Sequence, residues 1–406
     1  MKKDNFFLSE FRRLFEPEVT SSTLNVTSIK QAIDKRLTEL NLTANKVIEL
    51  FAIDYRSLTS IIDGTAKRVD LVTAIKLSHF LGIKIDDFIA IYAEQMDPEQ
   101  IGEIDRARKA SFISSNFDLQ QLKSGGFISS KFTIVDIEQR INKYFDFSDV
   151  TEYNQIDAGA AFSRVKKDPI AMMRDFWVKS AHTHFVKINN PYPYSRRDLL
   201  DILPKIRPYT IDVENGLVNV VRALFRLGVT VIYQPALSNV NVRGATFCIK
   251  GKPCIVLTDY QKRYTTLWHV LIHELHHALF DLDELEKWGY HLTGQPDLFL
   301  INDDQADSFA RQFLFSKERS RQVDPFINDD VIVKKFAESA QVHPSFAYAY
   351  HLFDLRQKGY EHAWGSKLAN KIPKSESALK TLNTQVFSKE AIQDSVDALM
   401  QTIFNF

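Results

Sequence analysis

The sequence contains the pattern H-E-x-x-H at His273, Glu274 and His277. On a helix, residues four apart lie on one face, so both imidazoles can reach one ion while Glu274 lies beside them. Zinc bound in this way keeps a coordination position for water, and a neighbouring glutamate can take a proton from that water. The pattern therefore predicts zinc-dependent hydrolysis of a peptide bond. The alternative interpretation is a buried helix that happens to carry histidines.

The segments around this pattern favour a helix preceded by a small sheet. Residues 268–280 are mostly apolar and contain no glycine or proline. A predicted amphipathic helix over 213–227 is followed by three short runs typical of strands. These runs are Val229–Tyr233, Thr246–Ile249 and Cys254–Thr258. We expect a small antiparallel sheet, and in many zinc peptidases an edge strand of such a sheet pairs with the substrate backbone.

A catalytic zinc ion is bound by three protein ligands, so the third must come from elsewhere in the chain. The metzincin arrangement is excluded, because no glycine and third histidine follow His277 at the required spacing. Asp303 and Asp307 are four residues apart on a predicted later helix and share one face. Asp303 could bind zinc while Asp307 hydrogen-bonds a ligand imidazole. The alternative is that both acids simply favour a helix N-terminus.

The segment 267–280, followed by Ala306-Asp307-Ser308-Phe309-Ala310, resembles the ImmA/IrrE family of zinc metallopeptidases. More loosely, the resemblance covers about residues 205–345. It implies that His273 and His277 bind zinc and that Glu274 is the general base.

The chain departs from the ImmA/IrrE pattern at two positions. Asp303 stands where the family has a glutamate as the third zinc ligand, and aspartate is one methylene shorter. His276 stands where the family usually has glycine, and we expect its side chain at the surface. Cys248 and Cys254 are expected to be buried strand cysteines, although a thiolate could act as an inhibitory zinc ligand.

Residues 28–92 show the apolar spacing of five short helices, with the tight turn Ala52-Ile53-Asp54 between the second and third. This region resembles the Cro/repressor (XRE) family of helix-turn-helix domains, except that Ala44 replaces a common glutamine. The resemblance implies that the helix after Asp54 enters the DNA major groove. Expected contacts to bases are Tyr55, Arg56, Thr59 and Ser60, and expected contacts to phosphate are Lys46, Lys67 and Arg68. Because acidic and basic residues are nearly balanced here, a dimerisation or docking module is the alternative.

The apolar spacing along the chain predicts a mainly α-helical protein, and its length and composition predict a multidomain, cytoplasmic one. The 406 residues carry 51 basic and 51 acidic side chains, so the chain has no overall positive charge that would attract nucleic acid. Its two cysteines argue against a disulfide framework. No secretory signal or membrane-spanning run is predicted. The expected segments are a flexible arm (1–26), a helix-turn-helix domain (27–95), a helical connector domain (96–204), an α+β zincin-like metallopeptidase domain (205–360), and a linker with a C-terminal amphipathic helix (361–406).

Together these patterns predict a DNA-binding regulatory endopeptidase that uses Zn²⁺. The resemblances imply a specific protein substrate, typically a helix-turn-helix repressor, whose cleavage turns on a stress, phage-defence or mobile-element operon. Double-stranded operator DNA is the second expected partner. The alternative is a repressor or antitoxin-like regulator whose peptidase-like domain senses a ligand without proteolysis. The sequence leaves open whether the chain forms a homodimer, because the apolar face of the last helix must be covered either by the protein body or by a second copy.

Overall fold

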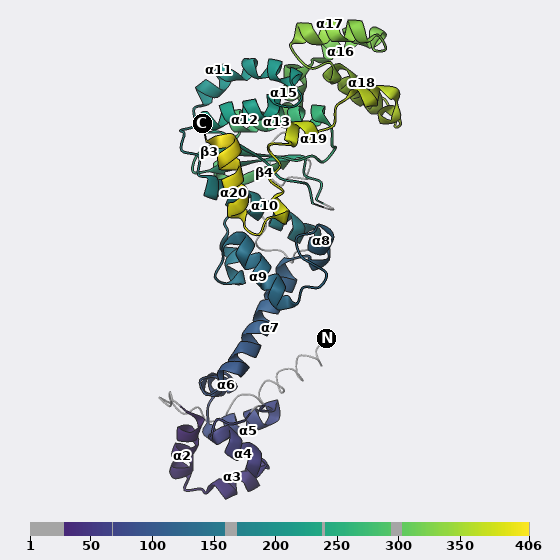
Figure 1. The fold of residues 1–406 in the computed structure, drawn as a ribbon. Helices are drawn as coiled ribbons and strands as arrows, with labels where there is room; N and C mark the ends of the chain where they lie inside the picture. The colour runs from purple at the N-terminus through teal and green to yellow at the C-terminus, as the bar shows by residue number, and fades with distance from the viewer. Residues whose placement is uncertain (1–27, 67, 159–168, 238–239, 294–302, 406) are drawn as a thin grey trace, which may run out of the picture. The chain divides into compact units, whose positions relative to one another are not determined.

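The computed structural model describes residues 28–66, 68–158, 169–237, 240–293 and 303–405. This part of the chain is mainly helical and contains one small mixed sheet (Figure 1). The chain divides into two compact units, Met1–Arg108 and Lys109–Phe406. Within the described ranges, no helix is both long enough and apolar enough to cross a membrane. The predicted arm over 1–26 and the predicted phosphate contact Lys67 lie outside the described residues.

The first unit contains five short helices at the predicted positions. They are α2 (Ile29–Leu40), α3 (Ala44–Phe51), α4 (Tyr55–Ile62), α5 (Leu71–Leu81) and α6 (Ile85–Ala93). The turn between α3 and α4 begins at Ala52, which has a left-handed backbone with φ of 47°. Asp54 then starts α4, because its carboxylate accepts a hydrogen bond from the backbone N–H of Ser57 at 3.0 Å. Val47 and Leu58 pack into one apolar core with residues of the other helices.

The second unit contains most of the helices. They are α8 (Leu119–Ser124), α9 (Ile134–Phe145), α10 (Pro169–Ile188), α11 (Arg196–Ile206), α12 (Gly216–Arg226), α13 (Tyr264–Phe280), α14 (Leu282–Trp288), α15 (Asp303–Leu314), α16 (Lys317–Val323), α17 (Asp330–Ala340), α18 (Ser345–Gln357), α19 (Glu376–Leu379) and α20 (Ile392–Leu399). Helix α7 (Pro98–Asn116) contains the boundary between the units. One continuous core runs from Ile113 to Phe404. The predicted connector, peptidase and C-terminal segments all contribute residues to this core.

The sheet has the strand order β1-β3-β2-β4. Its strands are β1 (Thr230–Tyr233), β2 (Gly244–Ile249), β3 (Lys252–Leu257) and β4 (Tyr290–Thr293). The expectation of a purely antiparallel sheet is wrong, because β1 pairs with β3 in parallel. Between β2 and β3, Lys250 and Gly251 have φ of 53° and 72°, as a tight two-residue hairpin turn requires. Strand β4, which the sequence analysis missed, lies at the edge beside β2.

Helix α13 is the centre of the second unit. All of its residues from Tyr264 to Leu279 are buried except Thr266 and His269, as is typical of a helix covered on every side. It packs against β2, β3 and α15. At its start, the Tyr264 hydroxyl donates a hydrogen bond to the Thr210 carbonyl at 2.7 Å. These contacts hold the H-E-x-x-H residues inside the protein.

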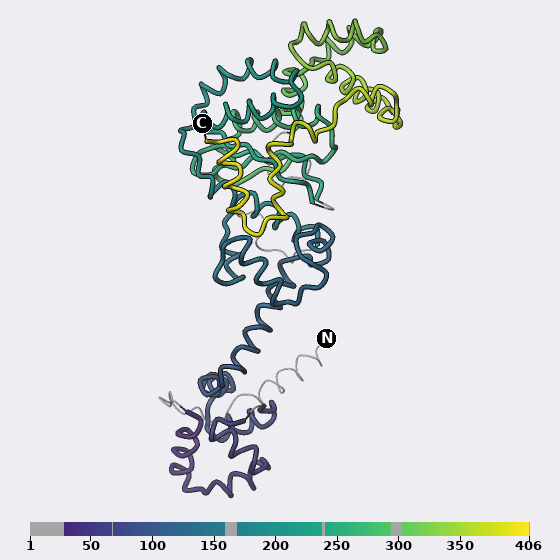
Figure 2. Tube along the Cα trace, viewed as in Figure 1, coloured from purple at the N-terminus to yellow at the C-terminus, as the bar shows by residue number. Residues whose placement is uncertain are grey.

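Residues 371–383, which were predicted to be a linker, pack on the core of the second unit, and the last helix packs against the same unit. Ile372, Leu379 and Leu382 are buried, and the Tyr264 N–H donates to the Pro373 carbonyl at 2.9 Å. Helix α20 packs against α10 in the same unit, where Figure 2 shows the yellow C-terminal segment beside the teal part of the chain. The apolar face of α20 is therefore covered within the chain itself.

Candidate metal centre

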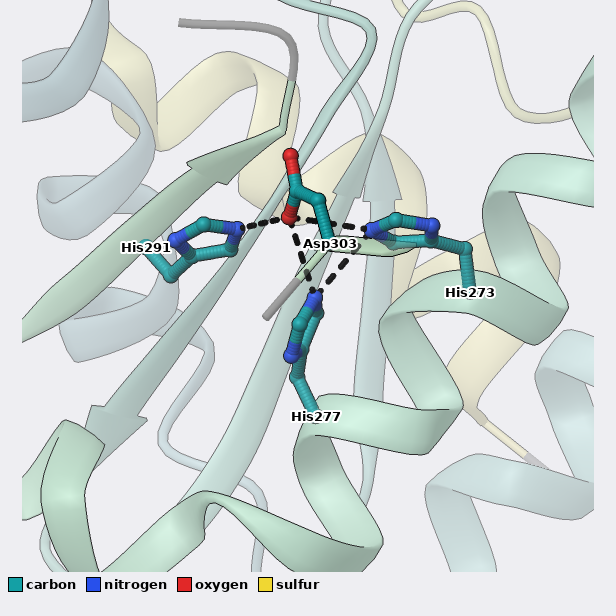
Figure 3. A group of neighbouring side chains, drawn as sticks. All are labelled: His273, His277, His291 and Asp303. Atoms are coloured by element: carbon teal, nitrogen blue, oxygen red, sulfur yellow. Dashed lines mark hydrogen bonds and ion pairs between the residues drawn. The ribbon is translucent and has the colours of Figure 1, made fainter. Parts of the chain in front are cut away.

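Three elements bring four side chains together in the second unit (Figure 3). Helix α13 contributes His273 and His277, whose Nε2 atoms lie 3.1 Å apart. The first residue of α15, Asp303, places Oδ1 at 3.5 Å from Nε2 of His273 and 3.7 Å from Nε2 of His277. Strand β4 contributes His291, whose Nε2 lies 2.8 Å from the same Oδ1. We call these four residues the His₃Asp cluster.

The His₃Asp cluster fits a divalent metal ion. Its four potential ligand atoms all lie within 4.8 Å of one another. In a tetrahedral zinc site with bonds of about 2.0–2.2 Å, neighbouring ligand atoms lie roughly 3.3–3.6 Å apart. The separations around Asp303 and between the two α13 imidazoles, 2.8–3.7 Å, bracket that value. Imidazole and carboxylate ligands suit zinc and several other first-row metals.

Two carboxylates outside the cluster hold the imidazoles in place. Oδ1 of Asp307 lies 2.8 Å from Nδ1 of His273, and Oδ2 of Asp281 lies 2.7 Å from Nδ1 of His277. An ionised carboxylate only accepts hydrogen bonds, so each Nδ1 carries the hydrogen and each Nε2 is left to bind an ion. Carboxylates in this position fix the tautomer and raise the basicity of a metal ligand. Asp307 thus makes the contact with a ligand imidazole that was expected of it, and Asp281 is a partner that the sequence analysis missed.

Asp307 also contacts a third histidine of α13. Its Oδ1 lies 3.1 Å from Nε2 of His269, and the opposite nitrogen of His269 lies 2.9 Å from the Tyr350 hydroxyl. The groups His269–His273–Asp307 and His276–His277–Asp281 also bring ligand atoms close together. In both groups, however, the carboxylate faces the Nδ1 side of a cluster imidazole. We therefore assign these carboxylates to the support of the His₃Asp cluster.

Electrostatics in the cluster are dominated by the pairing of imidazoles with carboxylates. Burial disfavours the protonated form of His273, but its hydrogen bonds to Asp303 and Asp307 outweigh this and raise its pKa to about 10. Burial also opposes ionisation of Asp303, yet hydrogen bonds from the three imidazoles hold its pKa far below the ordinary value. The carboxylates thus favour protonation of the imidazoles, and a metal ion must compete with protons for Nε2.

Glu274 lies under the sheet with its carboxylate between two strands. Its Oε2 accepts a hydrogen bond from the Thr246 hydroxyl of β2, and its Oε1 accepts one from the Thr293 hydroxyl of β4, each at 2.6 Å. The side chain is fully buried. A Cβ atom at Gly244 would lie only 2.5 Å from Oε1 of Glu274, so the absence of a side chain at this position makes room for the carboxylate.

Two expectations about neighbouring residues can be compared with the structure. The expectation that His276 lies at the surface is wrong, because the residue is only 9% exposed and its ring packs against Phe280 and Phe309. Helix α15 covers this face of α13, which a single helix pattern does not reveal. Cys254 is buried, and burial raises the pKa of both thiols, that of Cys248 to about 11. Such thiols stay protonated at neutral pH, which favours the expected role of ordinary strand cysteines.

The sequence analysis also missed His291, Thr246 and Thr293. His291 lies between the metal helix and the acidic segment of α15, and a third histidine there was a usable signal. The two threonines carry no such signal, because only strand pairing brings them to Glu274. In the register of β2 and β4, Thr246 is opposite His291 and Gly244 is opposite Thr293.

In the first unit, the expected DNA contacts lie at or near α4. Tyr55 is 61% exposed, and Arg56 and Arg68 are exposed. The hydroxyls of Thr59 and Ser60 donate to carbonyls of α4, those of Tyr55 at 2.8 Å and Ser57 at 3.0 Å. Lys46 is exposed and forms an ion pair with Glu49 at 2.7 Å. The pair reduces the charge that Lys46 offers to a phosphate.

Comparison with known proteins gives no match: no protein-family model, no curated protein and no solved structure matches this chain. Assignments of function therefore depend on the side chains themselves.

Proposed function

We propose that this chain is a regulatory zinc endopeptidase. The observation that carries the proposal is the convergence of His273, His277 and Asp303, with Asp307 and Asp281 behind the two imidazoles. Support for a peptide substrate comes from β4, which lies at the sheet edge and carries His291 of the cluster. An extended peptide can add to such an edge by backbone hydrogen bonds.

Zinc, when bound by the cluster, would polarise a carbonyl group and lower the pKa of a water to about 7. Glu274 would take the proton of the attacking water and pass it to the leaving amine. Each oxygen of its carboxylate has two lone pairs, so it can accept a second hydrogen bond while Thr246 or Thr293 uses the first. The threonines would orient the carboxylate and favour its ionised form.

The first unit would supply recognition of operator DNA. Support comes from Tyr55 and Arg56, which are exposed at the first two positions of α4, where a recognition helix presents its base-reading side chains. Both resemblances then point to a protein substrate of the helix-turn-helix class. Cleavage of such a repressor would switch on the operon that it controls.

A second candidate is a metal-dependent regulator without proteolysis. The observation that favours it is the full engagement of Glu274, since both of its oxygens already accept hydrogen bonds in a buried position. Both oxygens of a carboxylate held in this way have a hydrogen-bond donor without any substrate.

The test is incubation of the purified chain with the repressor encoded by a neighbouring gene, with and without a chelator. We expect one clean cut that chelation abolishes and that zinc restores. Glu274→Gln should retain stoichiometric zinc and lose cleavage, because the amide cannot accept the proton. Zinc binding without cleavage of any such repressor would favour the second candidate. Absence of stoichiometric metal, or full cleavage by Glu274→Gln, would overturn the proposed mechanism.

A further inference from the structure

We propose that His291 is a fourth protein ligand of the metal ion, and that in this conformation it occupies the position that a catalytic water needs. The inference rests on the proposed zinc centre and concerns how that centre is controlled. The two ligands of the H-E-x-x-H motif and one acid from a later helix are what the sequence predicts. His291 comes from β4, an element without any counterpart in that pattern.

The first argument is which carboxylate oxygen His291 contacts. Its Nε2 lies 2.8 Å from Oδ1 of Asp303, the oxygen that also faces the Nε2 atoms of His273 and His277. A histidine that merely oriented the carboxylate would serve as well on Oδ2, away from the other imidazoles. Instead, all three imidazoles surround Oδ1, as Figure 3 shows.

The second argument is the spacing and burial of the three rings. The His277 and His291 ring centroids lie 4.6 Å apart, close to the 4.9 Å between His273 and His277. His291 is as buried as the two imidazoles of α13. Its Nε2 also lies within 4.8 Å of every other ligand atom of the cluster. An ion at the centre of the cluster therefore has His291 among its neighbouring side chains, together with His273 and His277.

Four protein ligands change what zinc can do. Structural zinc sites have four protein ligands in a tetrahedron, whereas catalytic sites have three and keep one position for water or substrate. With His291 bound, a tetrahedral zinc ion has no position left. The centre is then latent until His291 leaves or a fifth ligand is added.

Strand β4 links this latency to the general base. His291 and Thr293 are two residues apart, so they lie on the same face of the strand. His291 closes the metal centre, and Thr293 holds Oε1 of Glu274 at 2.6 Å. Movement of this one edge strand would therefore open a coordination position and release a hydrogen bond from the base at the same time.

The experiment uses the full chain loaded with Co²⁺, whose visible spectrum reports coordination geometry. In the wild-type protein we expect a strong four-coordinate spectrum that does not change across about pH 6–9, which brackets the ionisation of water bound to such ions. In His291→Ala, water should fill the vacant position, and the spectrum should then titrate in that range. A wild-type spectrum that titrates, or a His291→Ala spectrum identical to that of the wild type, would overturn the inference.

A second measurement keeps the test decisive if His291→Ala does not fold. X-ray absorption by the Co²⁺-loaded wild-type chain distinguishes imidazole ligands from water by their outer-shell scattering, and we expect three imidazoles per ion. Two imidazoles per ion would contradict the inference. The control is His351→Ala, which removes a histidine paired with Asp324 at 2.8 Å outside the cluster. It should leave the Co²⁺ spectrum unchanged.

The two proposals fail in different ways. A wild-type chain that binds neither Zn²⁺ nor Co²⁺ at one ion per chain overturns the zinc centre and the inference with it. A chain that binds the metal but shows a titrating wild-type spectrum overturns only the role of His291 and leaves the proposed function standing.

Discussion

Oδ2 of Asp281 lies 2.7 Å from Nδ1 of His277, and His277 precedes Asp281 by four residues, about one helical turn. The contact fixes the imidazole so that Nε2 faces the His₃Asp cluster. We predict that Asp281→Asn lowers the affinity for zinc by about 10–100-fold, because removal of such a hydrogen-bond partner weakens a ligand without deleting it. Competition with a chromophoric chelator would measure the change.

The matched control is Asp324→Asn. It breaks the same kind of contact, the 2.8 Å pair between Asp324 and Nδ1 of His351, at a place outside the cluster. The control should bind zinc as the wild type does. Equal zinc affinity in Asp281→Asn and the wild type would show that Asp281 has no part in the centre.

Residues of the site that are placed by helical spacing could be predicted from the sequence, whereas those placed by strand pairing could not. His273 and His277 could be found because helical periodicity places them on one face of α13, and Asp303 and Asp307 because it places them on one face of α15. Asp281 follows the same rule, since it is four residues after His277 at the end of α13, and it could have been found. His291 could have been singled out as a histidine between the two ligand segments, but its position in the cluster could not be predicted, because it depends on the pairing of β4 with β2.

The fold shows the same division between local and long-range information. The five helices of the first unit match their predicted positions because capping residues and apolar spacing are local signals. The region over 371–383 resembled a linker because its few apolar residues are dispersed among lysines, serines and threonines. Ile372 and Leu379 are nevertheless buried, because the start of α13 pairs with the backbone of Pro373 and holds this segment on the core.

Gly244 gives a prediction about stability. A Cβ atom there would lie 2.5 Å from both Oε1 of Glu274 and Cγ1 of Val270, inside a packed interior. Gly244→Ala should therefore lower the free energy of unfolding by about 1–3 kcal/mol, as overpacking commonly does. Urea denaturation would measure the loss. The control is Gly365→Ala, where nothing lies within 4 Å of the added atom and only a small change is expected. A Gly244→Ala midpoint equal to that of the wild type would contradict the tight fit.

The cysteines give a prediction about pH. Burial, followed by the nearby charge of Glu286, raises the pKa of the Cys248 thiol to about 11. At pH 7.5 such a thiol is less than about 0.1% ionised, and only the thiolate reacts. Iodoacetamide should thus modify the native protein slowly, with a rate that still rises up to about pH 10, whereas the denatured chain should level off near the ordinary thiol pKa of about 8.5. Rapid modification of the native protein at neutral pH would instead favour a reactive thiolate and revive its role as a zinc ligand.

Arg56 gives a prediction about DNA, which concerns the first unit alone. Its side chain is exposed at the second position of α4, and a base-reading arginine there should contribute about 1–3 kcal/mol to specific binding. Arg56→Ala should therefore weaken binding to the chain's own promoter by about 5–150-fold, while binding to unrelated duplex changes far less. Lys84→Ala, which removes an exposed cation before α6, is the control and should leave promoter preference unchanged. Fluorescence anisotropy over a series of salt concentrations would measure both affinities. Equal losses on promoter and unrelated duplex would assign Arg56 to the phosphate backbone, and an absence of salt-sensitive binding by the wild type would make the first unit a protein-docking module.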